Sequence, residues 1–173
     1  LAGRTVPPHG LQAGLQRSIR AFELSRRRDG GRARSQVNPT TGVELACPCR
    51  EQAVVTLRPY RAEDAAALLE LFRDTVRQIN SADYSPEQIR AWASDEIALA
   101  DWTKRFEGRL AYVAEIDSQP VGFTDMTSHG HIDRFFVSSQ HQRCGVGREL
   151  LTRLIHDAQH LGLPSVTADV SIT

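Results

Sequence analysis

The residues Gln142-Arg143-Cys144-Gly145-Val146-Gly147-Arg148 form a glycine loop between a predicted strand, Ile132-Asp133-Arg134-Phe135-Phe136-Val137, and a predicted helix. Backbone N–H groups at a helix N-terminus have no intrahelical partner, and the helix dipole favours negative charge there. Glycine lets the backbone approach a phosphate closely, and Arg143 and Arg148 add charge-assisted contacts. The stretch therefore predicts an anion site, and the elements around it decide the fold.

Other classes of glycine loop fit this stretch poorly. A Walker A loop ends in Gly-Lys-Ser/Thr, which is absent here. A dinucleotide fingerprint needs three glycines after the first strand of a parallel βαβ unit, which is also absent. A helix cap of purely structural purpose stays open as an explanation of two glycines alone.

Three predicted strands precede the loop and form an antiparallel meander. They cover residues 110–115, 121–127 and 132–137, and residues 117–120 fit a four- or five-residue hairpin connection. After the loop, apolar residues at helical spacing predict a helix over residues 146–160, with Gly162 as its C-terminal stop. Alternating apolar residues then predict a strand over residues 166–172.

Helices separate the meander from an earlier predicted strand at residues 54–58. The first covers about residues 63–80, and Ser85-Pro86-Glu87-Gln88 predicts the start of the second through a capping box with Pro86 at the first helical position. A shorter helical piece is expected over residues 99–106.

The first 53 residues differ from the rest of the chain. Residues 1–50 carry nine arginines against three acidic residues, while the whole chain has a net charge of zero. Breakers such as Pro7-Pro8 and Gly30-Gly31 leave room for one short helix over residues 11–24. We expect residues 1–53 to be an Arg-rich, flexible extension. The alternative is that its basic cluster contacts nucleic acid or an acidic partner. We do not favour nucleic-acid binding.

Composition bounds the setting of the protein. No run approaches the ~20 apolar residues that a membrane span needs, and the first residues lack the order of a signal peptide. Three cysteines make no disulfide framework, which favours a reduced, cytoplasmic location. No cluster of His, Cys and carboxylate residues has metal-ligand spacing, so we expect no metal.

The segment from Gln142 to Gly147 fits every fixed position of the signature Gln/Arg-x-x-Gly-x-Gly/Ala, and residues 54–173 resemble the GNAT superfamily of N-acetyltransferases. The resemblance implies an α+β fold with a mixed, mostly antiparallel sheet flanked by helices. It implies acetyl-CoA as the cosubstrate, with the pantetheine arm along main-chain groups near Phe136 and Val137. The residues implied to hold the pyrophosphate are Gln142, Arg143, Cys144, Gly145, Val146, Gly147 and Arg148.

The resemblance also implies transfer of the acetyl group to an amine of a small molecule, peptide or protein. His131 and Asp133 are the candidate bases, because they lie on or just before the strand that leads to the loop. The plainer interpretations are a solvated turn histidine and a carboxylate paired with Arg134. Asp125 and Tyr84 are candidate walls of the acceptor site.

Members of the superfamily continue past the strand at residues 166–172 with a helix and two more strands, which this sequence does not contain. We therefore expect that strand to have an unpaired edge, and this polypeptide to show little or no turnover. The alternatives to an enzyme are a catalytically silent CoA-binding module, a gene fragment, or an interaction protein acting through its Arg-rich extension. The oligomeric state is open, and a homodimer is one option.

Overall fold

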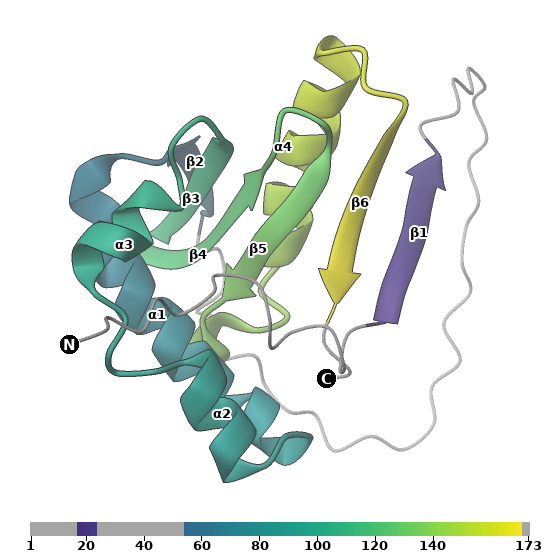
Figure 1. Cartoon of the computed structure of the whole chain (residues 1–173). Coiled ribbons are helices and arrows are strands. Elements are labelled where there is room, and N and C mark those ends of the chain that lie inside the picture. The colour runs from purple at the N-terminus through teal and green to yellow at the C-terminus, as the bar shows by residue number, and fades with distance from the viewer. Residues whose placement is uncertain (1–16, 24–53, 171–173) are drawn as a thin grey trace, which may run out of the picture.

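The computed structural model of the chain describes residues 54–170 and the backbone of residues 17–23 (Figure 1). Its strands are β1 (Arg17–Glu23), β2 (Thr56–Pro59), β3 (Leu110–Ile116), β4 (Gln119–Met126), β5 (His131–Val137) and β6 (Ser165–Val170). Its α-helices are α1 (Ala65–Gln78), α2 (Pro86–Trp92), α3 (Leu99–Lys104) and α4 (Val146–His160). None of the helices described is long and apolar enough to cross a membrane.

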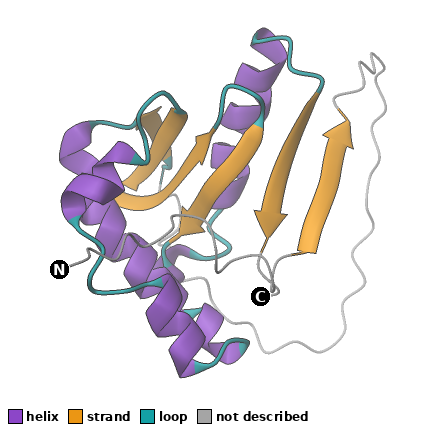
Figure 2. Cartoon of the chain, viewed as in Figure 1, coloured by secondary structure: helices purple, strands orange, loops and turns teal. Residues whose placement is uncertain are grey.

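The strands form one mixed sheet in the order β1-β6-β5-β4-β3-β2. Only β5 and β6 run parallel, and every other neighbouring pair is antiparallel. Helix α4 lies on one face of the sheet, and α1 to α3 lie on the other (Figure 2). Helices α1 to α3 do not extend over β6 (Figure 1). This arrangement confirms the α+β class and the antiparallel meander expected from the sequence.

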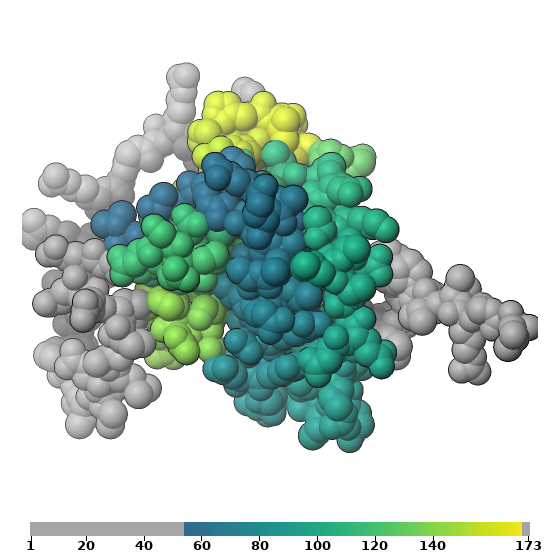
Figure 3. Space-filling view, turned by 90° about the vertical axis from the view of Figure 1, so that its left-hand side faces the viewer, coloured from purple at the N-terminus to yellow at the C-terminus, as the bar shows by residue number. Residues whose placement is uncertain are grey.

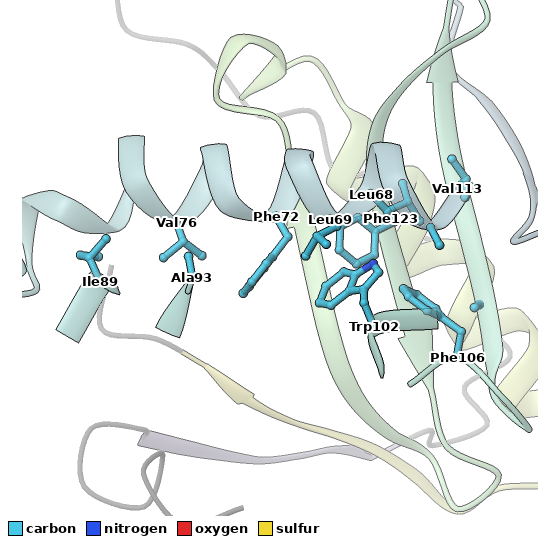
Figure 4. Close-up of a cluster of buried hydrophobic side chains, with 12 residues drawn as sticks. Leu68, Leu69, Phe72, Val76, Ile89, Ala93, Trp102, Phe106, Val113 and Phe123 are labelled. Carbon is cyan, nitrogen blue, oxygen red and sulfur yellow. The ribbon is translucent and has the colours of Figure 1, made fainter. Parts of the chain in front are cut away.

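The face toward α1 carries an aromatic core. Trp102 of α3 is fully buried and lies 5.1 Å from Phe72 of α1, centroid to centroid (Figure 4). Phe123 of β4 stacks at 5.5 Å on Phe136 of β5. In the space-filling view, α1 and the segments around α2 and α3 lie beside one another across this side of the molecule (Figure 3). The short helices are therefore held by packing, because helices of six or seven residues are not stable alone.

The face toward α4 carries an aliphatic core. Alternation along β3 sends Ala111 and Val113 to the α1 face and Tyr112, Ala114 and Ile116 to the α4 face. Helix α4 contributes apolar residues at helical spacing. They are Val146, Leu150, Leu154 and Ala158.

A β-bulge lies in β5 at Asp133. Asp125 of β4 is opposite Arg134, but Met126 is opposite Ile132, so Asp133 is the extra residue. Because of the extra residue, side chains two positions apart on either side of the bulge point to opposite faces of the sheet. Ile132 packs in the α4 core, and both Arg134 and Phe136 then face α1 and α3.

Two expectations about the chain ends are wrong. The helix expected over residues 11–24 is replaced by β1 over residues 17–23, and the rest of that segment lies outside the described residues. The edge of β6 is not left open, because β1 pairs with it antiparallel from Arg17 opposite Val170 to Glu23 opposite Ser165. Pairing satisfies main-chain groups that an edge strand would otherwise expose, which is the physical reason for the difference.

The internal predictions are confirmed with one change. Ser85 and Gln88 form the reciprocal capping box at the start of α2, with Pro86 at its first position. The β3–β4 hairpin is tighter than expected, because Asp117 and Ser118 take φ values of 50° and 63° in a two-residue turn.

Gly130 fixes how β6 approaches β5. Its φ is +86°, its carbonyl accepts from the Thr167 N–H at 2.9 Å, and a Cβ placed there would lie 2.5 Å from the Ser165 carbonyl oxygen. Both conformation and space therefore require glycine at the point where the two parallel strands meet.

We predict that Gly130→Ala lowers the free energy of unfolding well beyond the roughly 1–2 kcal/mol cost of a left-handed residue. Gly108→Ala is the matched control, because Gly108 has a φ of +68° and no atom within 4 Å of a built Cβ. Urea unfolding should separate the two variants by about 1–3 kcal/mol, the usual cost of overpacking. Equal losses would show that the contact with Ser165 relaxes freely.

Candidate functional site

Strands β5 and β6 pair over a short stretch only. Among the described residues their register covers His131 opposite Thr167 and Ile132 opposite Ala168. The bulge follows immediately, and within the described ranges β5 continues to Val137 without a ladder partner on the β6 side. The second half of β5 therefore has an edge along which an extended ligand could add as a strand does.

The pairing with β4 decides which main-chain groups of β5 face that edge. The Ser138 N–H donates to the Val121 carbonyl at 2.8 Å, so the hydrogen-bonded pairs that follow include Phe123 with Phe136. The main-chain groups of Phe135 and Val137 then point away from β4. Phe136, expected from the sequence to supply such groups, turns its main chain to β4 and its side chain into the aromatic core.

The loop after β5 folds back on the end of the strand. The Gln142 side-chain amide donates to the Val137 carbonyl at 2.8 Å and to the Ser138 carbonyl at 3.3 Å. Arg143 has a φ of 63°, and Gly145 caps α4 with a φ of +83°. No atom lies within 4 Å of a Cβ built at Gly145, so the space beside it is open to a ligand.

Helix α4 begins without a side-chain cap. No side chain accepts a hydrogen bond from its first turn, and the first intrahelical bond runs from the Glu149 N–H to the Gly145 carbonyl. Arg143 and Arg148 are exposed, and neither has an ion pair within the described part of the chain. Free amides, the helix dipole and two unpaired guanidinium groups together favour a phosphate-bearing ligand at this end of the helix.

Gly122 of β4 seats this helix end against the sheet. A Cβ at Gly122 would lie 2.9 Å from Cγ1 of Val146 and 3.0 Å from the Phe136 carbonyl oxygen. The first turn of α4 can therefore approach the strands closely. The sequence holds a signal for this, a glycine within an otherwise apolar strand, but it does not reveal which element comes close.

The Cys144 side chain is disulfide-bonded. The expectation from the sequence that the three cysteines make no disulfide framework is therefore wrong at this position.

Charged side chains surround the bulge. Asp125 is fully buried and accepts from Arg134 Nε at 2.7 Å and Nη2 at 2.9 Å, and from Arg109 Nη1 at 2.9 Å. Arg109 also lies 3.1 Å from Asp133, whose side chain is 47% exposed. Because it is buried and bonded to two guanidinium groups, Asp125 is a counter-ion and not the wall of an acceptor site. Burial lowers the pKa of the neighbouring Arg105, and repulsion by Arg134 lowers it further.

His131 lies beside the point where β5 and β6 part. Its Nδ1 lies 3.1 Å from Thr167 Oγ1, and its Nε2 lies 4.0 Å from Asp169 Oδ2. The side chain is 38% exposed, on the sheet face that α1 covers farther along. His131 thus has one hydroxyl within hydrogen-bonding distance and a carboxylate 4.0 Å away, whereas Asp133 is paired with Arg109.

Tyr84 lines a cleft of about 320 Å³ between the end of α1 and the start of α2. Its ring packs edge-on against Trp92 with centroids 5.5 Å apart. The end of α1 is tied to the end of β5, because Ser139 Oγ donates to Gln78 Oε1 at 2.7 Å and Thr75 Oγ1 lies 3.4 Å from the Val137 carbonyl. The cleft is lined by Arg77, Ser81, Tyr84, Pro86, Ile89 and Arg90.

Known proteins share this architecture. The family described as "Acetyltransferase (GNAT) domain" matches residues 80–173. The uncharacterized N-acetyltransferase YafP of Escherichia coli K12 is 36% identical over 119 residues, which are 69% of this chain and 74% of that protein. This chain belongs to the GNAT family.

Solved structures agree with that assignment. A GCN5-related N-acetyltransferase from Rhodopseudomonas palustris superposes with a TM-score of 0.67 at 33% identity, covering 71% of this chain and 77% of its own. The PaiA N-acetyltransferase of Thermoplasma acidophilum, solved in complex with coenzyme A, shares the fold with a TM-score of 0.57 at 19% identity. That match covers 64% of this chain and 75% of PaiA.

We predict that Asp125→Asn destabilises this GNAT domain by about 3–5 kcal/mol, because it leaves the Arg134 guanidinium buried without its counter-charge. Asp133→Asn is the control, because its partly exposed ion pair should contribute at most about 1 kcal/mol. Denaturant unfolding measures both. Similar losses for the two variants would contradict the central place given to Asp125.

Proposed function

We propose that this chain is an acetyl-CoA-dependent N-acetyltransferase that acts on an amine of a small molecule, a peptide or a protein. The observation that carries the proposal is that two features lie next to each other. An open edge of β5 ends directly at an uncapped helix N-terminus flanked by Arg143 and Arg148. A ligand with an extended amide arm and a pyrophosphate at its end matches both features at once.

The residues present fit such a cosubstrate. The amides at the start of α4, from Val146 to Arg148, would hold the pyrophosphate. The outward main-chain groups of Phe135 and Val137 would pair with the amide arm. Gln142 occupies the Val137 carbonyl, which leaves the Val137 N–H and both Phe135 groups for the ligand. Residues 54–173 then make up the catalytic domain, and a cytoplasmic location stays a prediction.

The reaction would be a direct transfer. The amine nitrogen attacks the thioester carbonyl carbon, the C–N bond forms, the C–S bond breaks, and the CoA thiolate leaves and takes up a proton. An N–H on the outward edge of β5 would stabilise the oxyanion. The amine must lose a proton, and His131 is better placed than Asp133 to accept it. Asp133 is paired with Arg109 at 3.1 Å, while the Thr167 hydroxyl orients the imidazole of His131 and the Asp169 carboxylate lies 4.0 Å from its Nε2.

The cleft at Tyr84 supports an acceptor that enters from the side of α1 and α2. It lies on the same side of the sheet as His131, and the contacts of Thr75 and Gln78 join that end of α1 to the end of β5. Its lining of two arginines, a tyrosine and apolar carbon suits a small polar molecule or one residue of a peptide.

We predict that Gly145→Ala lowers the affinity for CoA by about tenfold or more, because a methyl group would stand where the phosphate approaches. Gly162→Ala is the matched control. Gly162 has a φ of +68°, an equally open Cβ position, and lies just past the other end of the same helix. Titration calorimetry should find the affinity of Gly162→Ala close to that of the parent chain. An unchanged affinity in Gly145→Ala would remove the loop from the site.

For catalysis, we predict that His131→Gln removes the general base, whose usual contribution is about 10²–10⁴-fold, and so lowers the small turnover expected of this chain to the background rate, with little change in CoA affinity. Asp133→Asn should change kcat far less. Release of the CoA thiol across a panel of primary amines measures both. The reverse ranking would make Asp133 the base. CoA binding with no thiol release from any amine would favour the binding module over the enzyme.

A further inference from the structure

A pair of histidines lies on α4, at the end far from the glycine loop. His156 and His160 are four residues apart, so they lie on one face of the helix, and both are exposed. Their Nε2 atoms are 3.0 Å apart and their ring centroids 4.3 Å apart. Nothing in the acetyl-transfer site uses them.

The spacing of the two nitrogens suits one metal ion. Metal–imidazole bonds are about 2.0–2.1 Å long, so an ion bound to two nitrogens 3.0 Å apart would subtend an angle of about 90–97°. That angle matches neighbouring positions of a square-planar or tetragonal complex and falls short of the tetrahedral angle. Copper(II) and nickel(II) prefer such geometry with nitrogen and oxygen ligands.

A carboxylate already orients the first histidine. Asp157 Oδ1 lies 3.3 Å from His156 Nδ1. If Nδ1 carries the proton, the Nε2 lone pair points toward His160, the arrangement that outer-shell carboxylates commonly impose on ligating histidines. Asp157 itself is fixed by the Tyr112 hydroxyl and by Arg153 Nε at 3.0 Å, and the Arg153 guanidinium lies 4.6 Å from the Tyr112 ring centroid.

We propose that His156 and His160 form a two-histidine chelate for one copper(II) or nickel(II) ion, with Asp157 as the outer carboxylate. In the metal-free chain, one Nε2–H donates to the other Nε2. On binding, that ring changes tautomer: its proton leaves Nε2 and a proton is taken up on Nδ1 of the same ring, so both Nε2 lone pairs bond the ion. No group of three or more candidate ligands occurs within the described ranges, so water completes the coordination.

Calorimetric titration of the tag-free chain with Ni²⁺ tests the proposal. The expected result is one Ni²⁺ per chain with an affinity that falls at least about tenfold in His156→Gln and in His160→Gln. His129→Gln is the matched control, since it removes an exposed histidine from the turn at residues 127–130 and should leave the affinity unchanged. Mg²⁺, a hard ion that prefers oxygen ligands, should give no binding.

A second readout separates loss of binding from loss of folding. Ni²⁺ should raise the melting temperature of the parent chain and of His129→Gln, but not of the two α4 variants, while far-UV circular dichroism confirms that all four are folded. Ni²⁺ binding that persists at full affinity in both His156→Gln and His160→Gln would overturn the proposal. The outcome does not depend on CoA binding or on acetyl transfer.

Discussion

The buried ion pair between Asp125 and Arg134 is the interaction on which the rest of this structure depends. It joins β4 to β5 directly beside the bulge at Asp133, with both side chains almost fully buried. The Arg134 guanidinium also lies 4.3 Å from the centroid of the Phe106 ring, so the ion pair is anchored in the aromatic core. The buried Arg134 guanidinium has no access to water. A shift in the register of β5 would separate it from Asp125 and leave its charge among apolar side chains. We attribute the fixed place of the bulge to this constraint.

The bulge in turn shapes both ends of the site. Because it shifts the alternation by one residue, Ile132 packs toward α4 and pairs with β6, while the main-chain groups of Phe135 and Val137 face the open edge. Gln142 then folds the loop onto the end of that edge, and Gly122 lets the first turn of α4 approach it. The geometry of the proposed cosubstrate site thus depends on the buried ion pair, the Gln142 side-chain amide and the glycine at position 122.

Much of this could be predicted from the sequence, and the exceptions have physical reasons. The helical stripe of α4, the capping box at Ser85 and the meander are local patterns, so residue spacing alone reveals them. The signature from Gln142 to Gly147 marked the family for the same reason. The bulge is different, because it depends on which residue of β4 lies opposite Arg134, and no local pattern in β5 records that. The family resemblance implied main-chain groups near Phe136 and Val137, whereas the pairing with β4 turns those of Phe135 and Val137 to the edge.

The remaining differences come from long-range pairing. Strand β1 pairs with β6, which lies some 140 residues later in the chain, and residues 17–23 in isolation carry a pattern that also suits a helix. The partners of His131 and Asp133 likewise come from distant strands. In the proposed mechanism, the contacts of Arg109 and Thr167 favour His131 over Asp133 as the base, and neither residue is near them in sequence.

The most direct measurement is the change in backbone amide chemical shifts when CoA is added to the ¹⁵N-labelled chain. The account predicts that the largest changes fall on Phe135, Val137 and the amides from Gly145 to Arg148, and that Phe136 changes less because its N–H stays bonded to β4. Changes centred elsewhere, or none at these amides at a saturating concentration of CoA, would contradict it.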